Sequence, residues 1–291
     1  MILVNGCSFS APTDFGDNWC EGFYSKGILK YKPDNTIQHN SFKNVAVGGS
    51  SNLLIRRKTF YHVNSKMVTQ PPDYAIIQWS TIDRWDYPVF VNEERAKTFP
   101  RLDMRPDWVN KINYMNNGTD TFGYGRIFYE NYYSVFGAVL ETLEHIYHTQ
   151  QYLENANIPY KMITIGNLFN MDVSVEKLIY LQNRQDGYRG DYSSLNTEKN
   201  IFDKLEQCEE SWKELNIINE LLEKIDFTKF IFTDDVSIKG FGGGIIEWFL
   251  NKNEILTGGN FHPSQEQCLN FFNEFLWPKI ELDIENYKKI K

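Results

Sequence analysis

A serine near the start of the chain stands where a catalytic nucleophile could be held. The apolar run Ile2–Val4 is short, and the turn Gly6–Ser10 follows it almost directly. A serine on such a strand-to-helix turn, here Ser8, would be exposed at the sheet edge beside free backbone N–H groups. These groups can hold an anion or a developing oxyanion. The alternative interpretation is an ordinary turn or helix N-cap, because Gly-x-Ser is common after strands.

A histidine near the other end of the chain could act as the general base. His262 lies within Asn260–Ser264, and the spacing of Ser264 and Gln267 is that of a capping box, which predicts a helix start. His262 would then lie in the loop before that helix and could reach across the sheet edge to Ser8. An imidazole, with an ordinary pKa of about 6.5, can activate a hydroxyl for attack on a carbonyl. The alternative is a loop histidine that packs or is solvated.

Strands alternating with helices must position these two residues. Short apolar runs typical of buried parallel strands are separated by segments of helical period. The pattern predicts an α/β fold, a three-layer α/β/α domain with a central, mostly parallel sheet of about five strands. Catalytic loops of such sheets lie at the carboxyl ends of the strands. The predicted strands are Ile2–Val4, Phe42–Val47, Tyr74–Trp79, Tyr160–Ile165 and Lys229–Phe232, and the predicted helices are Ser51–Lys66, Tyr129–Asn155, Ile201–Lys224 and one after Pro263.

Two insertions, at about 83–128 and 166–200, do not fit a minimal version of this plan. Both are polar and turn-rich and follow strand ends, so they are placed to form a lid or a substrate wall. The first is rich in aromatic residues, which could stack on sugar rings or form a small core of the loop itself. No linker in the sequence indicates a second domain, and a single domain over residues 1–291 is predicted.

The segments that contain Ser8 and His262 resemble the SGNH (GDSL-like) hydrolase superfamily. Gly6–Ser10 is similar to the family's first sequence block, with Ser8 as nucleophile and Cys7 in place of the usual aspartate. Asn260–Pro263 is similar to the last block, with His262 as base. The resemblance covers residues 1–82 and 228–270, and it implies a flavodoxin-like α/β/α fold and ester hydrolysis.

Two middle segments extend the resemblance. Asn44–Asn52 is similar to the second block, in which the backbone N–H of Gly49 would donate to the oxyanion together with that of Ser8. Its continuation through Arg56 is similar to SGNH-like proteins of bacteriophages. Ser80–Asp83 lies where the family has Gly-x-Asn-Asp.

The third block departs from the family at its oxyanion donor. The family's asparagine falls on Ile82, which cannot donate a hydrogen bond. Asn52, Thr81 or Ser80 could replace it, and we choose Asn52 because it carries an amide and begins a predicted helix near the cleft. Losing one oxyanion donor typically lowers the rate by about 10²–10³.

The last block departs from the family at the acid that orients the histidine. The position three residues before His262 holds Gly259. Asp234 and Asp235, at the end of the last predicted strand, are candidate acids by location. A Ser-His dyad oriented by a backbone carbonyl is the alternative.

Three further residues are predicted substrate contacts, namely Arg56, Trp79 and Asp83. Arg56 follows the candidate site loop and could bind an anionic group, or it could lie on a solvated helix face. Glu141 and Glu144 with His145 and His148 cluster on one predicted helix, but they match no HExxH pattern and no second cluster accompanies them. No metal or cofactor is predicted.

Composition narrows the class of protein. The chain has 291 residues, of which 42% are hydrophobic, so it can form a packed core. Its net charge of -8 argues against binding duplex nucleic acid, which needs a basic surface. No apolar stretch approaches the roughly 18 residues of a membrane span, and the first residues do not read as a signal peptide. The 4 cysteines are sparse and form no C-x-x-C pattern, which favours a cytoplasmic protein, in the host cytoplasm if viral.

The sequence therefore predicts a serine-dependent acyl or acetyl esterase that uses Ser8 and His262, acting on a carbohydrate ester or a modified small molecule. An acyltransferase with the same acyl-serine intermediate is one alternative. A catalytically inactive SGNH-like binding protein is the other, because Ile82 and Gly259 interrupt the family pattern.

Overall fold

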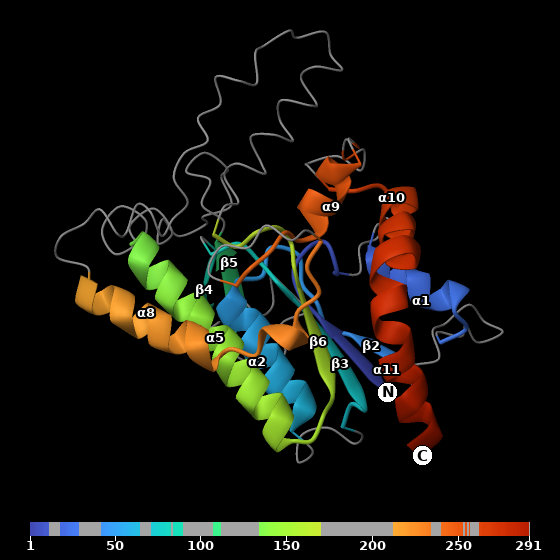
Figure 1. The fold of residues 1–291 in the computed structure, drawn as a ribbon, viewed down its shortest axis with the longest axis horizontal. Helices are drawn as coiled ribbons and strands as arrows, with labels where there is room; N and C mark the ends of the chain where they lie inside the picture. The colour runs from blue at the N-terminus through green and yellow to red at the C-terminus, as the bar shows by residue number, and fades with distance from the viewer. Residues whose placement is uncertain are drawn as a thin grey trace, which may run out of the picture.

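The computed structural model describes residues 1–11, 18–28, 42–64, 71–82, 84–89, 107–111, 134–169, 212–233, 240–252, 254, 256 and 262–290. At the centre of the described part is a 4-stranded sheet of parallel strands in the order β2-β1-β3-β6 (Figure 1). The strands are β1 (Ile2–Asn5), β2 (Phe42–Asn44), β3 (Tyr74–Trp79) and β6 (Tyr160–Thr164).

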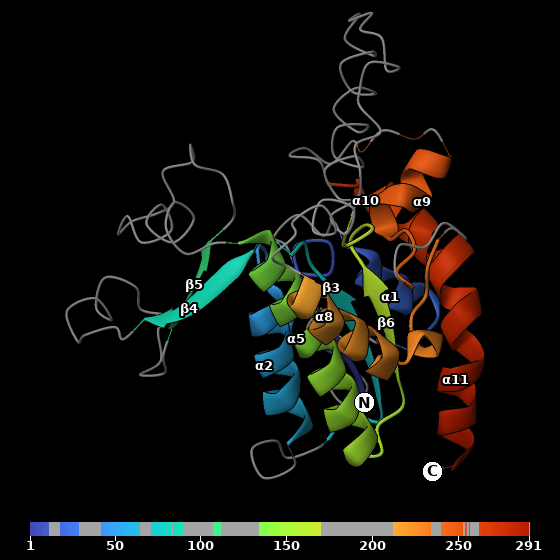
Figure 2. The same ribbon diagram turned by 60° about the vertical axis from the view of Figure 1, so that its left-hand side comes forward.

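Helices cover both faces of this sheet (Figure 2). Successive side chains of a strand point to opposite faces, so Ile2 and Val4 join one hydrophobic cluster while Leu3 joins the other. Helices α2, α5 and α8 pack on the face of Leu3, and α1, α9, α10 and α11 pack on the opposite face. Their bounds are α1 (Gly22–Ser25), α2 (Asn52–Val63), α5 (Val135–Asn155), α8 (Trp212–Lys224), α9 (Ile245–Asn251), α10 (Gln265–Asn270) and α11 (Trp277–Ile290), with a 3-10 helix η1 (Trp19–Glu21) before α1 and a π-helix η4 (Phe271–Leu276) between α10 and α11.

The predicted start of the last helix is confirmed. Helix α10 begins at Gln265, and the side chain of Ser264 accepts a hydrogen bond from the backbone N–H of Gln267. The Gln267 side chain accepts from the N–H of Ser264 over 3.0 Å, which completes the capping box. His262 thus lies just outside the helix, in the loop that enters it.

The prediction of about five strands is wrong for the described residues, because the segment 229–232 does not form a strand. Its only pairing with the sheet is an isolated bridge between Met162 and Phe230. The side chain of Asp226 caps a short 3-10 helix, η3 (Phe227–Lys229), and this helix takes the residues that would have begun the strand. One backbone bond, from the N–H of Ile231 to the carbonyl of Met162 over 2.9 Å, continues the sheet pattern.

The first insertion contains two strands that the sequence analysis did not predict. β4 (Trp85–Val89) and β5 (Asp107–Lys111) pair antiparallel in a separate 2-stranded sheet, and β4 contacts α2. The alternation of Trp85, Tyr87 and Val89 with more polar residues was a period-two signal for a strand. Most of the second insertion, beyond Phe169, lies outside the described residues.

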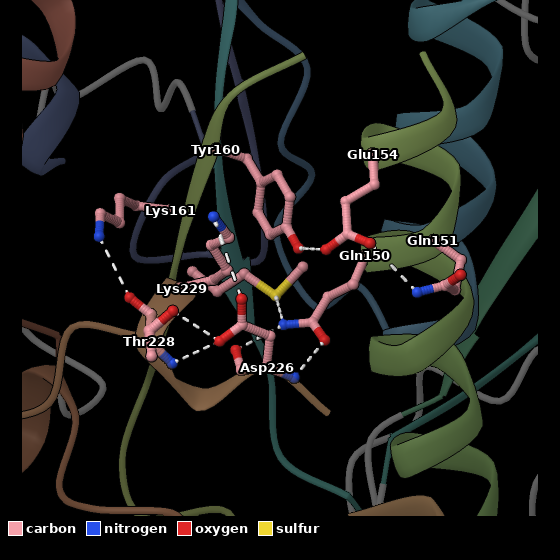
Figure 3. Close-up of polar contacts among 9 residues, drawn as sticks. Gln150, Gln151, Glu154, Tyr160, Lys161, Asp226, Thr228 and Lys229 are labelled. Carbon is pink, nitrogen blue, oxygen red and sulfur yellow. Dashed lines mark hydrogen bonds and ion pairs between the residues drawn. The ribbon is translucent and has the colours of Figure 1, made fainter. Parts of the chain in front are cut away.

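A buried glutamine ties α5 to the segment before η3 near the start of β6 (Figure 3). The Gln150 side chain donates to the carbonyl of Asp226 and accepts from the N–H of the same residue, each over 2.9 Å. The Lys161 ammonium donates to the carbonyl of Thr228 over 3.2 Å. These contacts lie at the amino end of β6, so they stabilise the fold on the side away from the carboxyl ends of the strands.

Among the helices that the structure describes, none combines the length and the apolar character that a membrane span needs.

Candidate functional site

The strand order defines where a ligand would bind. From β1 the chain passes to β2 on one side, and β3 pairs with the other side of β1. In an open parallel sheet the crevice lies outside the carboxyl ends of the two strands where the order reverses, here β1 and β3. Ser8 follows β1 and Thr81 follows β3, so both belong to the loops that border this crevice.

The turn that carries Ser8 is closed by backbone hydrogen bonds. The carbonyl of Cys7 accepts from the N–H groups of Ser10 and Ala11 over 3.0 and 2.9 Å. Ser8 itself is half-buried, and within the described part of the chain neither its hydroxyl nor its N–H has a hydrogen-bond partner. Both groups are therefore available to a ligand.

A buried polar network lies beneath this turn and fixes its shape. The Gln78 side chain donates to Sγ of Cys7 over 3.0 Å and accepts from the hydroxyl of Ser10. The Trp19 indole donates to the same hydroxyl over 2.9 Å. A Cβ at Gly6 would lie 2.8 Å from Cβ of Gln78, so this position requires glycine. Cys7, at the family's aspartate position, is thus a buried acceptor that supports the turn.

The glycine turn after β2 lies against Ser8. A Cβ placed on Gly48 would be 4.0 Å from Cβ of Ser8. Gly49 has a φ of 78°, in the left-handed region that favours glycine. Its N–H meets no acceptor among the residues that the structure describes. The structure thus brings the second block of the sequence next to the first.

His262 packs beside the same turn. Its ring centroid lies 5.0 Å from that of Phe9, with an angle of 32° between the rings. His262 is half-buried, whereas Phe9 is 3% exposed and belongs to a hydrophobic cluster. Because Phe9 directly follows Ser8, the contact brings the loop before α10 to the turn after β1. The sequence analysis missed this role of Phe9, since no local pattern links the two ends of the chain.

Asn52 joins three elements at the edge of the crevice. Its Oδ1 accepts from the N–H of Ser80 over 2.8 Å, and its Nδ2 donates to the carbonyl of Ser80 and to the hydroxyl of Thr142, each over 3.2 Å. Asn52 is 3% exposed, and both hydrogens of its amide have acceptors. These bonds connect the start of α2 to the end of β3 and to α5. Its role as an oxyanion donor stays a prediction.

The other residues after β3 differ in what they can donate. Ile82 packs against the hydrophobic cluster beneath α2 and α5. The hydroxyl of Ser80 is buried and has no hydrogen-bond partner. Thr81 is half-buried, and its hydroxyl has no partner in the described residues. Thr81 is therefore the hydroxyl-bearing side chain of this loop that is both partly exposed and unpartnered among the described residues.

Arg56, a predicted substrate contact, is engaged with α5. Its Nη1 lies 3.3 Å from Nδ1 of His148, and its guanidinium lies 5.9 Å from the centre of the Phe60 ring. Burial lowers the pKa of the Arg56 guanidinium, and the carboxylates of Glu144 and Glu141 oppose that shift. The two carboxylates thus offset only part of the effect of burial on Arg56, whose Nε has no hydrogen-bond partner.

Of the remaining predicted site residues, one is buried in the core and the others are not described. Trp79 has no exposed surface, and its indole N–H donates to Sδ of Met162 over 3.2 Å, so it packs within the core. Asp83, Asp234 and Asp235 lie outside the described residues.

The histidine and glutamate cluster on α5 does not form a metal site in this structure. Within the described ranges, no group of 3 or more His, Cys, Asp or Glu side chains could hold a metal ion. His145 is 7% exposed, and its Nδ1 has no hydrogen-bond partner. Burial, with the nearby charge of Arg56, lowers the pKa of His145 to about 3, so the ring is neutral at pH 7.

Comparisons with protein-family models, with curated proteins and with solved structures found no match to this chain. The chemistry and geometry of the residues at the carboxyl ends of β1 and β3 are therefore what indicates a function.

Proposed function

We propose that this chain is a serine-dependent ester hydrolase of SGNH-like architecture, with Ser8 as nucleophile and His262 as general base. One observation carries the proposal: the ring of His262 packs 5.0 Å from that of Phe9, the residue next to Ser8. A nucleophile, a nearby imidazole and unpartnered backbone N–H groups are the parts that acyl transfer to serine needs.

The proposed reaction has two steps. The Ser8 hydroxyl attacks the ester carbonyl while His262 accepts its proton, and the N–H groups of Ser8 and Gly49 hold the oxyanion. The intermediate collapses, and the protonated His262 gives the proton to the departing alcohol. Water then attacks the acyl-serine as His262 takes a proton from it, and the carboxylic acid leaves with Ser8 restored. The group that orients His262 is an acid such as Asp234 or Asp235, or a backbone carbonyl.

A fluorophosphonate probe tests the nucleophile directly. Wild-type protein should be labelled covalently, and Ser8→Ala should abolish labelling. Ser25→Ala is the matched control, because Ser25 is an exposed serine on α1 and its removal should leave labelling intact. Turnover of 4-nitrophenyl acetate should fall about a hundredfold or more in His262→Ala. Equal labelling of wild type and Ser8→Ala would refute the proposal.

A catalytically inactive binding protein is the second candidate, and the loop after β3 favours it. The amide of Asn52 is already bonded to Ser80 and Thr142, and the partly buried Ile82 packs against a hydrophobic cluster. Such a protein would bind ligand in the same crevice without a complete set of oxyanion donors. It would show neither probe labelling nor ester turnover, with the fold intact by circular dichroism.

A further inference from the structure

One arginine in the loop after β3 has no counter-charge among the residues that the structure describes. Arg84 lies in the loop between β3 and β4, and its Nε and Nη1 are buried without a hydrogen-bond partner. Arg84 as a whole is half-buried, and no ion pair joins it to a described acid. Burying a charged group without a partner is costly, so proteins rarely keep one unless something else supplies the opposite charge.

A second arginine of the same region has carboxylates nearby. Arg56, on α2, lies beside His148, and the charges of Glu144 and Glu141 act on it, although its Nε is also buried without a hydrogen-bond partner. Helix α2 also contacts β4, the strand that begins directly after Arg84. Two arginines thus lie on contacting parts of the fold. Nearby described carboxylates act on Arg56, whereas no ion pair joins Arg84 to a described acid.

The topology places the unmatched arginine at the crevice. β3 pairs in parallel with β1, with Asn5 opposite Ile77, so the loops that follow both strands leave the same edge of the sheet. Ser8 lies in one of these loops and Arg84 in the other. The chain carries a net charge of -8, which repels anions at long range. A local guanidinium is therefore what an anionic ligand would require here.

We propose that Arg84 binds an anionic oxygen group, a carboxylate or a phosphate, of the ligand that occupies this crevice. A planar guanidinium offers paired N–H donors that match two oxygens of either group. The inference rests on the proposed function for the position of the ester at Ser8, and it names the substrate class as an ester that carries a negative charge.

Binding and turnover test this inference separately. Calorimetric titration with inorganic phosphate and with acetate measures anion binding without catalysis and distinguishes the two anion types. Arg84→Gln should weaken the affinity for the bound anion about tenfold or more. Arg57→Gln, which removes the same charge from an exposed position, is the control and should leave that affinity unchanged.

Turnover gives the second measurement. Arg84→Gln should lower kcat/KM about tenfold or more for the mono-4-nitrophenyl ester of succinate, which is anionic, and leave that for 4-nitrophenyl acetate unchanged. An equal effect on both esters, or none on either, would overturn the anion proposal while Ser8 labelling keeps the hydrolase proposal intact. Arg84-dependent anion binding without any turnover would refute the hydrolase proposal and leave the anion site standing.

Stability separates a ligand contact from a structural role. Removing an unpartnered buried charge should not destabilise the fold, so Arg84→Met should keep or raise Tm. A fall in Tm of several degrees would show that Arg84 has a partner within the folded chain, and this would overturn the inference. Arg84→Lys keeps the charge without the paired donors, so its anion affinity should lie between those of wild type and Arg84→Gln.

Discussion

The ring of Phe9 lies 5.0 Å from the ring of His262, at an angle of 32°. Phe9 is nearly fully buried, so its ring is held by the core and offers His262 a fixed surface. The imidazole is thereby kept near the turn after β1, which carries Ser8. A packing contact thus connects the two residues that the sequence analysis selected from opposite ends of the chain.

Loosening this contact should impair catalysis more than folding. Phe9→Leu keeps an apolar side chain but removes the aromatic surface, so we expect ester turnover to fall by about tenfold as His262 gains freedom. Phe249→Leu is a matched control, because Phe249 is a buried phenylalanine of the same hydrophobic cluster. Steady-state kinetics and thermal melts of both variants would measure this. If Phe9→Leu and Phe249→Leu lost the same activity for the same fall in Tm, the contact would have no positioning role.

Asn52 should prove important for stability. Asn52→Ala leaves the buried N–H and carbonyl of Ser80 without a side-chain partner, which should cost about 1–3 kcal/mol of unfolding free energy. Thr142→Val removes a single acceptor of the Asn52 amide and should cost less. Urea denaturation measures both values. If Asn52→Ala abolished turnover at unchanged stability, Asn52 would instead be the oxyanion donor.

Thr81, after β3, is half-buried, and its hydroxyl is unpartnered among the described residues. Thr81→Val preserves its shape and removes the hydroxyl. If that hydroxyl supplies an oxyanion bond, kcat should fall by about 10²–10³ with little change in Tm. Thr81→Ser keeps the donor and should retain most of the activity. Full activity in Thr81→Val would leave the oxyanion to backbone N–H groups alone.

Stability should fall as the pH is lowered below neutrality. Burial and the charge of Arg56 lower the pKa of His145 to about 3, whereas an unfolded histidine titrates at about 6.5. The unfolded state therefore binds the proton first, and the stability present above pH 6.5 is lost progressively as pH falls toward 3. Partial burial lowers the pKa of half-buried His62 to about 4, which contributes in the same direction.

Two variants of α5 separate this effect from general acid denaturation. His145→Leu removes the titrating group, so its Tm should change less between pH 7 and 5 than that of the wild type. Gln151→Ala changes a residue of the same helix that does not titrate and should keep the wild-type pH dependence. Parallel profiles for wild type and His145→Leu would contradict the prediction.

Two neighbouring glutamines of α5, near the amino end of β6, allow buried and exposed hydrogen bonds to be compared (Figure 3). Gln150 is 1% exposed and bonds both backbone groups of Asp226, so Gln150→Ala should cost about 1–3 kcal/mol. Gln151 bonds Glu154 at the exposed surface, and Gln151→Ala should change stability by less than about 0.5 kcal/mol. Chemical denaturation of both variants checks this. Similar small losses would show that the Gln150 bonds are replaced by water.

Local sequence patterns determined several of the helices and strands and the turn that carries Ser8. β3 matches its predicted bounds of Tyr74–Trp79, and the capping box at Ser264 was readable because both partners lie within one helical turn. The turn at Ser8 was predicted from a glycine and small residues that come directly after an apolar run. Such features depend on neighbouring residues, so the sequence alone reveals them.

Tertiary structure decided which of these residues meet. Three features depend on segments far apart in the chain, namely the Phe9–His262 packing, the bonds of Asn52 to Ser80 and the burial of Nε and Nη1 of Arg84 without a hydrogen-bond partner. The number of strands in the described sheet was also decided there, because an Asp226-capped turn competed with strand pairing after α8. Contacts of this kind are set by how the packed elements fill space, which no local pattern encodes.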